Sequence, residues 1–245
     1  MNEGGLTCDA FLGGRVHAWQ PARGYRAGTD PVFLAAACPA RAGQSVLELG
    51  CGVGVASLCL RARVPDVRIM GVERQAAYAD LARRNGLDVT LADLAALPAA
   101  LRARSFDHVI ANPPYFATGD GTAARDDGRE AALREATPLS VWIGAARARL
   151  RPKGWLTMIQ SADRLPDCLA ALAGGFGAIS ILPLQSRMGR PARRILLRAR
   201  KGGKAPFTLL APLVLHAGVR HEKDGDDFAP VAASVLRDGA PIDWG

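Results

Sequence analysis

The sequence has no apolar run long enough to span a bilayer, because Arg, Asp or Pro interrupts each candidate stretch. The first residues, MNEGGLTCDAFLGG, lack the basic start and apolar stretch of a signal peptide. The 5 cysteines are scattered without a CxxC pair, and the 4 histidines are not spaced as metal ligands. These absences predict a cytoplasmic protein with reduced thiols, no membrane association and no metal.

Internal repeats are also missing, so the chain is not a repeat protein. Its 245 residues suffice for one large domain, and a hydrophobic content of 49% can supply the core. We expect a single domain over residues 1–245. It would comprise an N-terminal cap segment (1–43), a catalytic core (44–203) and a C-terminal extension (204–245). The sequence predicts no oligomeric state.

Positive charge is abundant and unevenly distributed. The net charge is +8, and the segment RMGRPARRILLRARKGGK, from Arg187 to Lys204, contains eight Lys or Arg residues and no acidic residue. Neutralised phosphates release condensed counterions, so such a basic segment favours a polyanion such as nucleic acid. A solvated, charged surface strand would have the same composition, and charge alone does not decide between the two.

Apolar stretches alternate with helical patterns from Ser45 onward. Strands separated by helices indicate an α/β fold, with a mostly parallel sheet covered on both faces. A preceding helix should begin at Thr29 or Asp30, with Pro31 in its first turn. The expected strands are 45–49, 67–72, 89–92, 106–111, 155–160, 179–183, 194–198 and, with a weaker pattern, 206–216; the expected helices are 55–62, 75–84, 138–150 and 164–172.

A glycine-rich turn follows the first of these strands, in the stretch ELGCGVG. Glycines two residues apart allow a tight turn and leave no Cβ to block a ligand that lies across it. Dinucleotide-binding Rossmann proteins have the pattern G-x-G-x-x-G, which would require glycine at Val55. The spacing here is G-x-G-x-G, with the acidic Glu48 just before it.

Acidic residues end the next two expected strands. Glu73 lies about twenty residues beyond the glycines, where a carboxylate can accept hydrogen bonds from both ribose hydroxyls. Asp93 ends the following strand and could accept a hydrogen bond from the amino group of an adenine. Either residue alone could instead cap the helix that follows it. Three such features in order, at successive strand ends, favour one shared ligand.

These motifs together resemble the Rossmann-like class I methyltransferases that bind S-adenosylmethionine, over roughly residues 44–200. The resemblance implies a mostly parallel, seven-stranded sheet with helices on both faces. It also implies that the glycine loop holds the methionine part of the cofactor, the acid after the second strand the ribose, and the acid after the third strand the adenine. The cofactor-binding residues predicted in this way are Glu48, Gly50, Cys51, Gly52, Gly54, Glu73 and Asp93, together with Asn112.

The stretch Asn112-Pro113-Pro114-Tyr115 ends the fourth expected strand. A planar amine is a poor nucleophile, because its lone pair is delocalised into the ring. The Asn112 side-chain oxygen and the Pro113 carbonyl could accept both of its N–H bonds and favour a tetrahedral nitrogen. The prolines fix φ and lack N–H groups, and Tyr115 offers a ring on which a flat base or amide can stack, with Phe116 in support. In isolation the tetrapeptide could equally be a Pro-Pro turn with a buried Tyr.

Asn-Pro-Pro-Tyr is typical of methyltransferases that modify planar nitrogens, namely adenine N6, guanine N2 and glutamine side-chain amides. Release-factor glutamine methyltransferases carry a separate N-terminal helical domain, for which about 44 residues are too few. Ribosomal guanine enzymes of this signature often have a duplicated or extra domain. A catalytically silent binding protein would show altered site residues, and none is altered.

The N-terminal stretch RVHAWQPARGYRAGTDPVFLAAA resembles the segment before the glycine loop in the bacterial adenine-N6 methyltransferases of valine tRNA. In that family a similar stretch starts a helix beside the cofactor, which implies such a place for Arg26, Thr29 and Asp30. The segment GRPARRILLRARKG is also similar to that family. The basic residues predicted to contact RNA are Arg187, Arg190, Arg193 and Arg194.

The favoured function is therefore methyl transfer from S-adenosylmethionine to the N6 amine of an adenine in tRNA, near the anticodon, with tRNA or another nucleic acid as partner. The alternatives are a protein glutamine N5-methyltransferase acting on a release factor and a ribosomal RNA guanine-N2 methyltransferase. The charged segment from Thr118 to Glu135 could order over RNA as a lid, or could be solvated and disordered.

Overall fold

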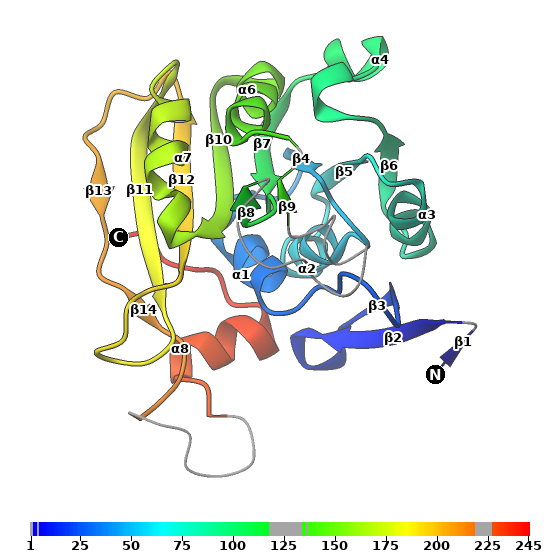
Figure 1. The fold of residues 1–245 in the computed structure, drawn as a ribbon, viewed down its shortest axis with the longest axis horizontal. Coiled ribbons are helices and arrows are strands. Elements are labelled where there is room, and N and C mark those ends of the chain that lie inside the picture. Colours follow the sequence, from blue (N-terminus) through cyan, green and yellow to red (C-terminus); the bar gives the residue numbers. More distant parts are fainter. Residues whose placement is uncertain (1, 4, 118–133, 136, 219–226) are drawn as a thin grey trace.

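The computed structural model describes residues 2–3, 5–117, 134–135, 137–218 and 227–245. At its centre is a nine-stranded sheet (Figure 1). The strands are β4 (Ser45–Leu49), β5 (Arg68–Glu73), β6 (Asp88–Leu91), β7 (Phe106–Ala111), β10 (Leu150–Ser161), β11 (Phe176–Gln185), β12 (Arg194–Lys201), β13 (Thr208–Leu209) and β14 (Leu213–Val214). Their order is β13-β11-β12-β10-β7-β4-β5-β6, and β14 also pairs with β11. A separate two-stranded pair joins β8 (Phe116–Ala117) to β9 (Arg134–Glu135).

The sheet confirms the predicted α/β fold class with a mostly parallel sheet, although it has nine strands instead of seven. From β10 to β6 all neighbours are parallel, whereas β12 is antiparallel to both β10 and β11. The seven longer strands are those expected, with ends shifted by a few residues. The single strand expected over 206–216 is instead the two short strands β13 and β14. Pro212 lies between them, and a proline cannot donate a ladder hydrogen bond, so the segment pairs only in pieces.

Helices cover the two faces of the sheet in separate groups. They are α1 (Asp30–Ala37), α2 (Val55–Arg63), α3 (Ala76–Arg84), α4 (Ala99–Arg102), α6 (Leu139–Arg149), α7 (Leu165–Leu172) and α8 (Pro230–Ala233). Side chains alternate along each strand, so Ile110 packs with α1 and α2, while Val109 and Ala111 pack with α6 and α7. No described helix is long and apolar enough to cross a membrane.

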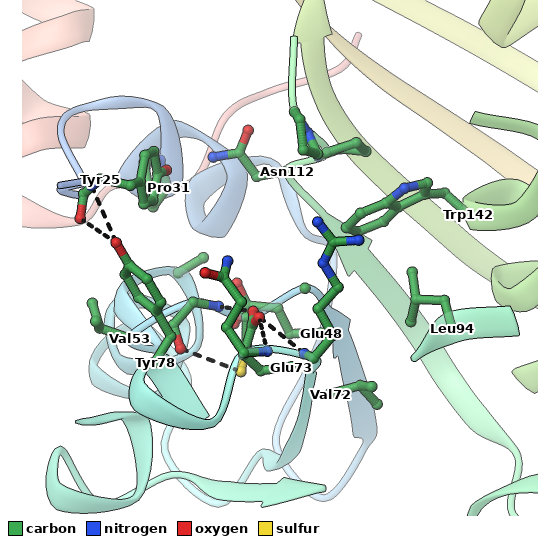
Figure 2. A pocket seen from close by; sticks show the side chains of 18 of the residues that line it. Tyr25, Pro31, Glu48, Val53, Val72, Glu73, Tyr78, Leu94, Asn112 and Trp142 are labelled. Atoms are coloured by element: carbon green, nitrogen blue, oxygen red, sulfur yellow. Dashed lines mark hydrogen bonds between the residues drawn. The ribbon is translucent and has the colours of Figure 1, made fainter. Parts of the chain in front are cut away.

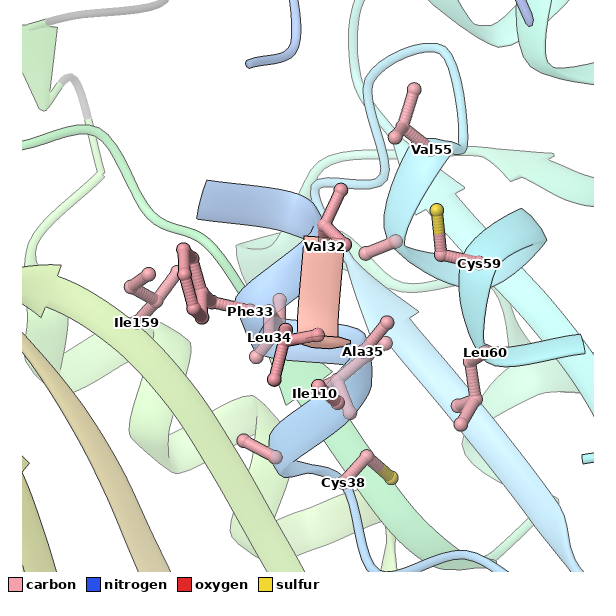
Figure 3. Packing of buried hydrophobic residues seen from close by; sticks show 14 of the residues in the cluster. Val32, Phe33, Leu34, Ala35, Cys38, Val55, Cys59, Leu60, Ile110 and Ile159 are labelled. Carbon is pink, nitrogen blue, oxygen red and sulfur yellow. The ribbon is translucent and has the colours of Figure 1, made fainter. Parts of the chain in front are cut away.

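Helix α1 is buried almost completely, since seven of its eight residues are buried. Figure 3 shows it packed over the sheet, with α2 beside it. Its apolar side chains contact the same cluster as those of α2 and the sheet: Val32, Phe33, Leu34 and Ala35 from α1, Val55, Cys59 and Leu60 from α2, and Ile110 and Ile159 from the sheet. The burial of this helix fixes the position of Asp30, its first residue, near the carboxyl ends of the strands.

An N-terminal hairpin, not expected from the sequence, packs beside α2 and α3. It consists of β2 (Leu6–Phe11) and β3 (Val16–Pro21), with β1 (Asn2–Glu3) paired to β2. The side-chain amide of Asn85 holds the hairpin in place. Asn85 Nδ2 donates hydrogen bonds to the carbonyls of Trp19 (3.0 Å) and Val53 (2.9 Å). The Trp19 N–H donates in return to Asn85 Oδ1 (2.8 Å). One side chain thus connects the hairpin to the glycine-rich turn.

The C-terminal segment packs against the C-terminal end of α1. The Ile242 N–H donates to the Ala36 carbonyl (2.9 Å), and the Trp244 indole N–H donates to the Ala37 carbonyl (3.1 Å). Ile242 and Trp244 are themselves buried in the cluster that contains α1. One hydrophobic core therefore includes residues of the hairpin, the sheet and the C-terminal segment.

The strand order brings distant parts of the chain together at one edge of the sheet. β4 lies between β5 and β7, and Leu49 is in register with Val72 on one side and Ala111 on the other. The chain leaves all three strands at this carboxyl edge, so Gly50 and Asn112 directly follow their strands and Glu73 is the last residue of its own. Ligands of open α/β sheets bind at such an edge.

Candidate active site

A cavity lies at the carboxyl ends of β4, β5, β6 and β7 (Figure 2). Ten of the residues predicted from the sequence line it: Glu48, Gly50, Cys51, Gly52, Glu73, Asp93, Asn112, Pro113, Pro114 and Tyr115. The structure thus gathers the glycine loop, both acidic strand ends and the Asn-Pro-Pro-Tyr segment around one space. The other predicted cofactor residues, Arg26, Thr29, Asp30 and Gly54, are not among those that line it.

Three aromatic side chains that sequence reasoning missed also line the cavity. Tyr25, Tyr78 and Trp142 come from the segment before α1, from α3 and from α6 (Figure 2). The Tyr78 hydroxyl accepts a hydrogen bond from the Tyr25 N–H (3.1 Å) and donates to the Tyr25 carbonyl (3.3 Å). The Trp142 indole donates to the Thr137 carbonyl (3.1 Å). Tyr25 lies within the N-terminal stretch RVHAWQPARGYRAGTDPVFLAAA, directly before Arg26, but no local signal placed Trp142 beside a loop ninety residues earlier.

Two glycines of the loop are required for different reasons. Both have positive φ, +62° at Gly50 and +54° at Gly52. A Cβ at Gly50 would lie 2.4 Å from the Trp142 ring, so this glycine allows an indole to pack against the turn. A Cβ at Gly52 would meet nothing within 4 Å. Only Gly52 therefore matches the expectation that a missing side chain leaves room for a ligand.

The two acids at strand ends bond to nearby backbone and also face the cavity. Glu73 Oε1 accepts the N–H groups of Arg74 and Gln75 (both 2.9 Å), and its Oε2 accepts the Gly52 N–H (2.9 Å). Asp93 Oδ1 accepts the Ala95 N–H (2.8 Å) and so caps the short turn after β6. A carboxylate oxygen can accept two hydrogen bonds, so Glu73 Oε2 and Asp93 retain capacity for a ligand.

Glu48 is the most deeply buried acid of the site, with 3% of its surface exposed. Its Oε2 accepts hydrogen bonds from the backbone N–H (3.1 Å) and the hydroxyl of Ser57. Burial raises the pKa of Glu48 to about 8, although the Ser57 hydrogen bonds favour the ionised form. Without a ligand, this carboxyl group is therefore largely protonated at neutral pH.

The Glu48→Gln variant should gain stability relative to the wild type as pH rises. A carboxyl whose pKa is higher in the folded than in the unfolded protein stabilises the fold at low pH, and this contribution is lost as pH rises from about 4.5 to about 8. Glutamine does not titrate, so the free energies of unfolding should be similar at pH 5 and differ by roughly a few kcal/mol at pH 8.5.

Urea denaturation of both proteins between pH 5 and pH 9 measures this difference. The buried His108 has its pKa lowered to about 4 by desolvation, and its titration is common to both proteins. The difference between the curves therefore isolates Glu48. Parallel pH profiles would contradict a raised pKa at this residue.

The Asn-Pro-Pro-Tyr segment is held by hydrogen bonds to two other elements, α1 and β10. The Tyr115 hydroxyl bonds to the Asp30 carboxylate at the start of α1 and lies 3.0 Å from Asn112 Oδ1. The buried Gln160 of β10 donates from Nε2 to the Pro114 carbonyl (3.3 Å). Burial raises the pKa of Tyr115, and the Asp30 carboxylate raises it further, so the hydroxyl stays protonated and donates.

Two of the three residues expected from the N-terminal resemblance, Asp30 and Arg26, bond to other side chains of the protein. Asp30 contacts Tyr115 and also Arg194, whose Nε lies 3.3 Å from Asp30 Oδ2. Arg26 forms an ion pair with Asp9 (2.6 Å). Thr29 occupies the cap position of α1 without a side-chain cap hydrogen bond. Their predicted contact with the cofactor stays a prediction.

The basic residues predicted to contact RNA fall into three environments. Arg187 bonds to the Asp227 carboxylate and the Ala217 carbonyl, so its charge is already paired within the protein. Arg190 and Arg193 are exposed, and neither forms an ion pair with a described residue. Arg194 lies over the Tyr115 ring, 3.9 Å from its centroid. The segment 118–133, most of the proposed lid, lies outside the described residues, as does the side chain of Phe116.

The cavity is chemically suited to S-adenosylmethionine, whose sulfonium and ammonium groups are cationic. Glu48, Glu73 and Asp93 supply acidic groups around it, and the aromatic rings supply apolar contact surface. The open space beside Gly52 leaves room for a ligand against the backbone. Among the described residues, no group of three or more His, Cys, Asp or Glu side chains could hold a metal ion.

Comparison with known proteins agrees with this arrangement. Residues 27–185 match the protein family described as "Methyltransferase small domain". A protein of Porphyromonas gingivalis named "tRNA1(Val) (adenine(37)-N6)-methyltransferase" is 31% identical over 86% of this chain and 89% of its own length. A protein of the same name from Actinobacillus succinogenes is 30% identical over 80% of this chain and 85% of its own length.

Solved structures show the same fold. A predicted O-methyltransferase from Agrobacterium tumefaciens superposes with a TM-score of 0.69 and 26% identity, over 87% of this chain and 98% of that one. A 16S ribosomal RNA N2 methyltransferase from Thermus thermophilus, solved with S-adenosylmethionine and guanosine, has a TM-score of 0.52 and 21% identity, over 80% of this chain and 50% of that one. The chain belongs to the methyltransferase small domain family and is an S-adenosylmethionine-dependent methyltransferase of the class I fold.

Proposed function

We propose that this methyltransferase modifies the exocyclic N6 amine of an adenine in tRNA, close to the anticodon. The observation that carries the proposal is the Asn112-Pro113-Pro114-Tyr115 segment at the edge of the cavity. The names of relatives about 30% identical over most of the chain, which specify adenine N6 in a valine tRNA, support the choice of acceptor.

We assign the cofactor-binding roles by position around the cavity. The turn from Gly50 to Gly52 would hold the methionine part of S-adenosylmethionine, with Glu48 beneath it. Glu73 would accept the ribose hydroxyls through Oε2, which receives one hydrogen bond from the described residues. Asp93, just after β6, would accept a hydrogen bond from the adenine amino group. When bound, this cofactor supplies an electrophilic methyl group.

Asn112 and Pro113 would hold the acceptor amine. The Asn112 side-chain oxygen and the Pro113 carbonyl are two acceptors on consecutive residues, and together they can bind both N–H bonds of one planar amine. Such binding turns the nitrogen lone pair out of conjugation and aims it at the methyl group. Pro114, held by Gln160, keeps the backbone rigid, so the orientation is established before the reaction.

The β11–β12 loop would supply contacts to the tRNA backbone. β11 ends at Gln185 and β12 begins at Arg194, which pairs with Ser161 at the end of β10. The loop between them therefore lies at the same edge of the sheet as the cavity. Its exposed Arg190 and Arg193 are free to neutralise phosphates, and the target adenine would leave its stack to enter the site.

Methylation of unmodified tRNA transcripts with labelled S-adenosylmethionine tests the proposal. Incorporation is expected into a valine tRNA with adenine next to the anticodon, and not into the same tRNA with guanine at that position. A purified release factor tests the protein substrate in parallel. Label that enters the release factor but not tRNA would overturn the proposal, as would equal labelling of the adenine and guanine transcripts.

A further inference from the structure

Arg194 occupies an unusual place for a residue of a basic surface segment. It is the first residue of β12, and its guanidinium carbon lies 3.9 Å from the centroid of the Tyr115 ring. Its Nε is 3.3 Å from Asp30 Oδ2, and its Nη1 donates to the Arg193 carbonyl (3.2 Å). The side chain remains one-third exposed. This cation is therefore stacked on the Tyr115 ring but still in contact with solvent.

Asp30 forms contacts with both Arg194 and Tyr115. Its carboxylate bonds to the Tyr115 hydroxyl and to Arg194, and its position is fixed by the buried helix α1. A guanidinium over an aromatic face is attracted by about 0.5–2 kcal/mol, depending on solvent exposure. The geometry is therefore favourable but weak enough to be exchanged for a stronger contact.

The guanidinium and a flat base compete for the same kind of contact. Both stack on an aromatic face at van der Waals distance, so they cannot occupy one face of Tyr115 together. In this structure Arg194 covers such a face. A base that stacks there must first displace the guanidinium, which then needs another anionic partner.

A nucleic acid supplies both the base and an anionic partner for the displaced guanidinium. Every nucleotide carries a backbone phosphate, which binds arginine through two parallel hydrogen bonds and is a stronger partner than a carboxylate shared with a tyrosine hydroxyl. The exposed Arg190 and Arg193 are on the loop just before Arg194 and would bring a phosphate near. A free nucleoside has no such group.

We propose that Arg194 makes access to the face of Tyr115 conditional on a phosphate: it covers the ring in the free protein and moves to a backbone phosphate when RNA delivers the base. Arg194 is then a positioning residue that selects a nucleic acid over a free nucleoside as acceptor. This inference rests on the proposed function.

Activities of Arg194→Gln towards two acceptors give the first test. With tRNA, kcat/KM should fall roughly 10-fold or more, because a phosphate contact is lost. With adenosine as acceptor, kcat/KM should rise several-fold, because the ring face is open. Arg193→Gln is the matched control, since it removes an equal charge one residue away without a Tyr115 contact; it should weaken tRNA binding without the rise in adenosine methylation.

A purely structural role for Arg194 would lower both activities, and a simple phosphate contact would lower only that with tRNA. Either result would overturn the inference. A wild-type protein that methylates no tRNA would overturn the proposed function itself and, with it, this inference. The two failures are therefore distinguishable.

The position of the side chain can be measured without catalysis. In an NMR spectrum of the full chain, the Nε–H signal of Arg194, identified by its loss in Arg194→Gln, should be shifted upfield by the Tyr115 ring current. The shift should disappear in Tyr115→Leu and on addition of a tRNA anticodon-loop oligonucleotide, and should persist with adenosine. An upfield signal that survives saturation with the oligonucleotide would refute the displacement.

Discussion

The Asn112→Ala variant should lower kcat for methyl transfer by about 10²–10³-fold, the usual cost of one preorganised hydrogen-bonding group at a reacting centre. Alanine removes one of the two acceptors proposed to hold the amine. The remaining Pro113 carbonyl cannot orient both N–H bonds, so the lone pair is no longer aimed at the methyl group. Most of the proposed cofactor contacts lie on the glycine loop, Glu73 and Asp93, so the Kd for S-adenosylmethionine should change by no more than about twofold.

Single-turnover methylation with labelled cofactor measures the rate, and calorimetry measures cofactor binding. Asn112→Asp is the matched control, because it keeps an oxygen for the amine and for the Tyr115 hydroxyl, and it should retain more activity than the alanine variant. A rate that falls only in proportion to cofactor affinity would mean that Asn112 binds the cofactor rather than the acceptor.

The Gly50→Ala variant should be the most disruptive single substitution in the cofactor site. It places a Cβ 2.4 Å from the Trp142 ring at a residue with φ of +62°. The positive φ costs about 1–2 kcal/mol, and the displacement of a buried indole adds about 1–3 kcal/mol. Trp142 lines the cavity, so its movement should also weaken S-adenosylmethionine binding by more than about tenfold.

Denaturant unfolding and calorimetric titration separate the two costs. Gly43→Ala is the control, because Gly43 has a similar φ of +78° but open space around an added Cβ. It should show the backbone cost alone, with unchanged cofactor affinity. The double variant Gly50→Ala with Trp142→Leu should lose less stability than the sum of the two single variants, since the clash is removed. Equal losses in Gly50→Ala and Gly43→Ala would show that the indole is not the reason for this glycine.

Local sequence patterns predicted the central sheet because each strand and its flanking turn carry their own signal. The strand 45–49 with its glycine turn, and Glu73 at the end of the next strand, are readable within a few residues. The parallel arrangement then follows from the intervening helices. The N-terminal hairpin was missed although β2 (LTCDAF) alternates apolar and polar residues and β3 alternates buried and less buried ones. It is held by Asn85, about seventy residues away.

The parts of the site that the sequence did not reveal depend on contacts between distant residues. Asp30 and Arg194 are 164 residues apart and meet on Tyr115. The sequence resemblance indicated that Asp30 lies near the cofactor site and that Arg194 is basic, but neither indicates that the two share a tyrosine. Arg187 illustrates the same limit, because its partner Asp227 belongs to the C-terminal extension. The sequence shows which side chains are charged, but it does not show which residues they pair with in the fold.

The position of β4 between β5 and β7 also bears on how the enzyme is made. Leu49 and Ala111, the residues that bring the glycine loop beside Asn112, are far apart in the chain but paired in the sheet. During synthesis the glycine loop leaves the ribosome well before β7, so β4 has β5 but not β7 as a neighbour. Contacts of this sequence separation form slowly. The nascent chain therefore has no complete methyl-transfer site until β7 has docked against β4.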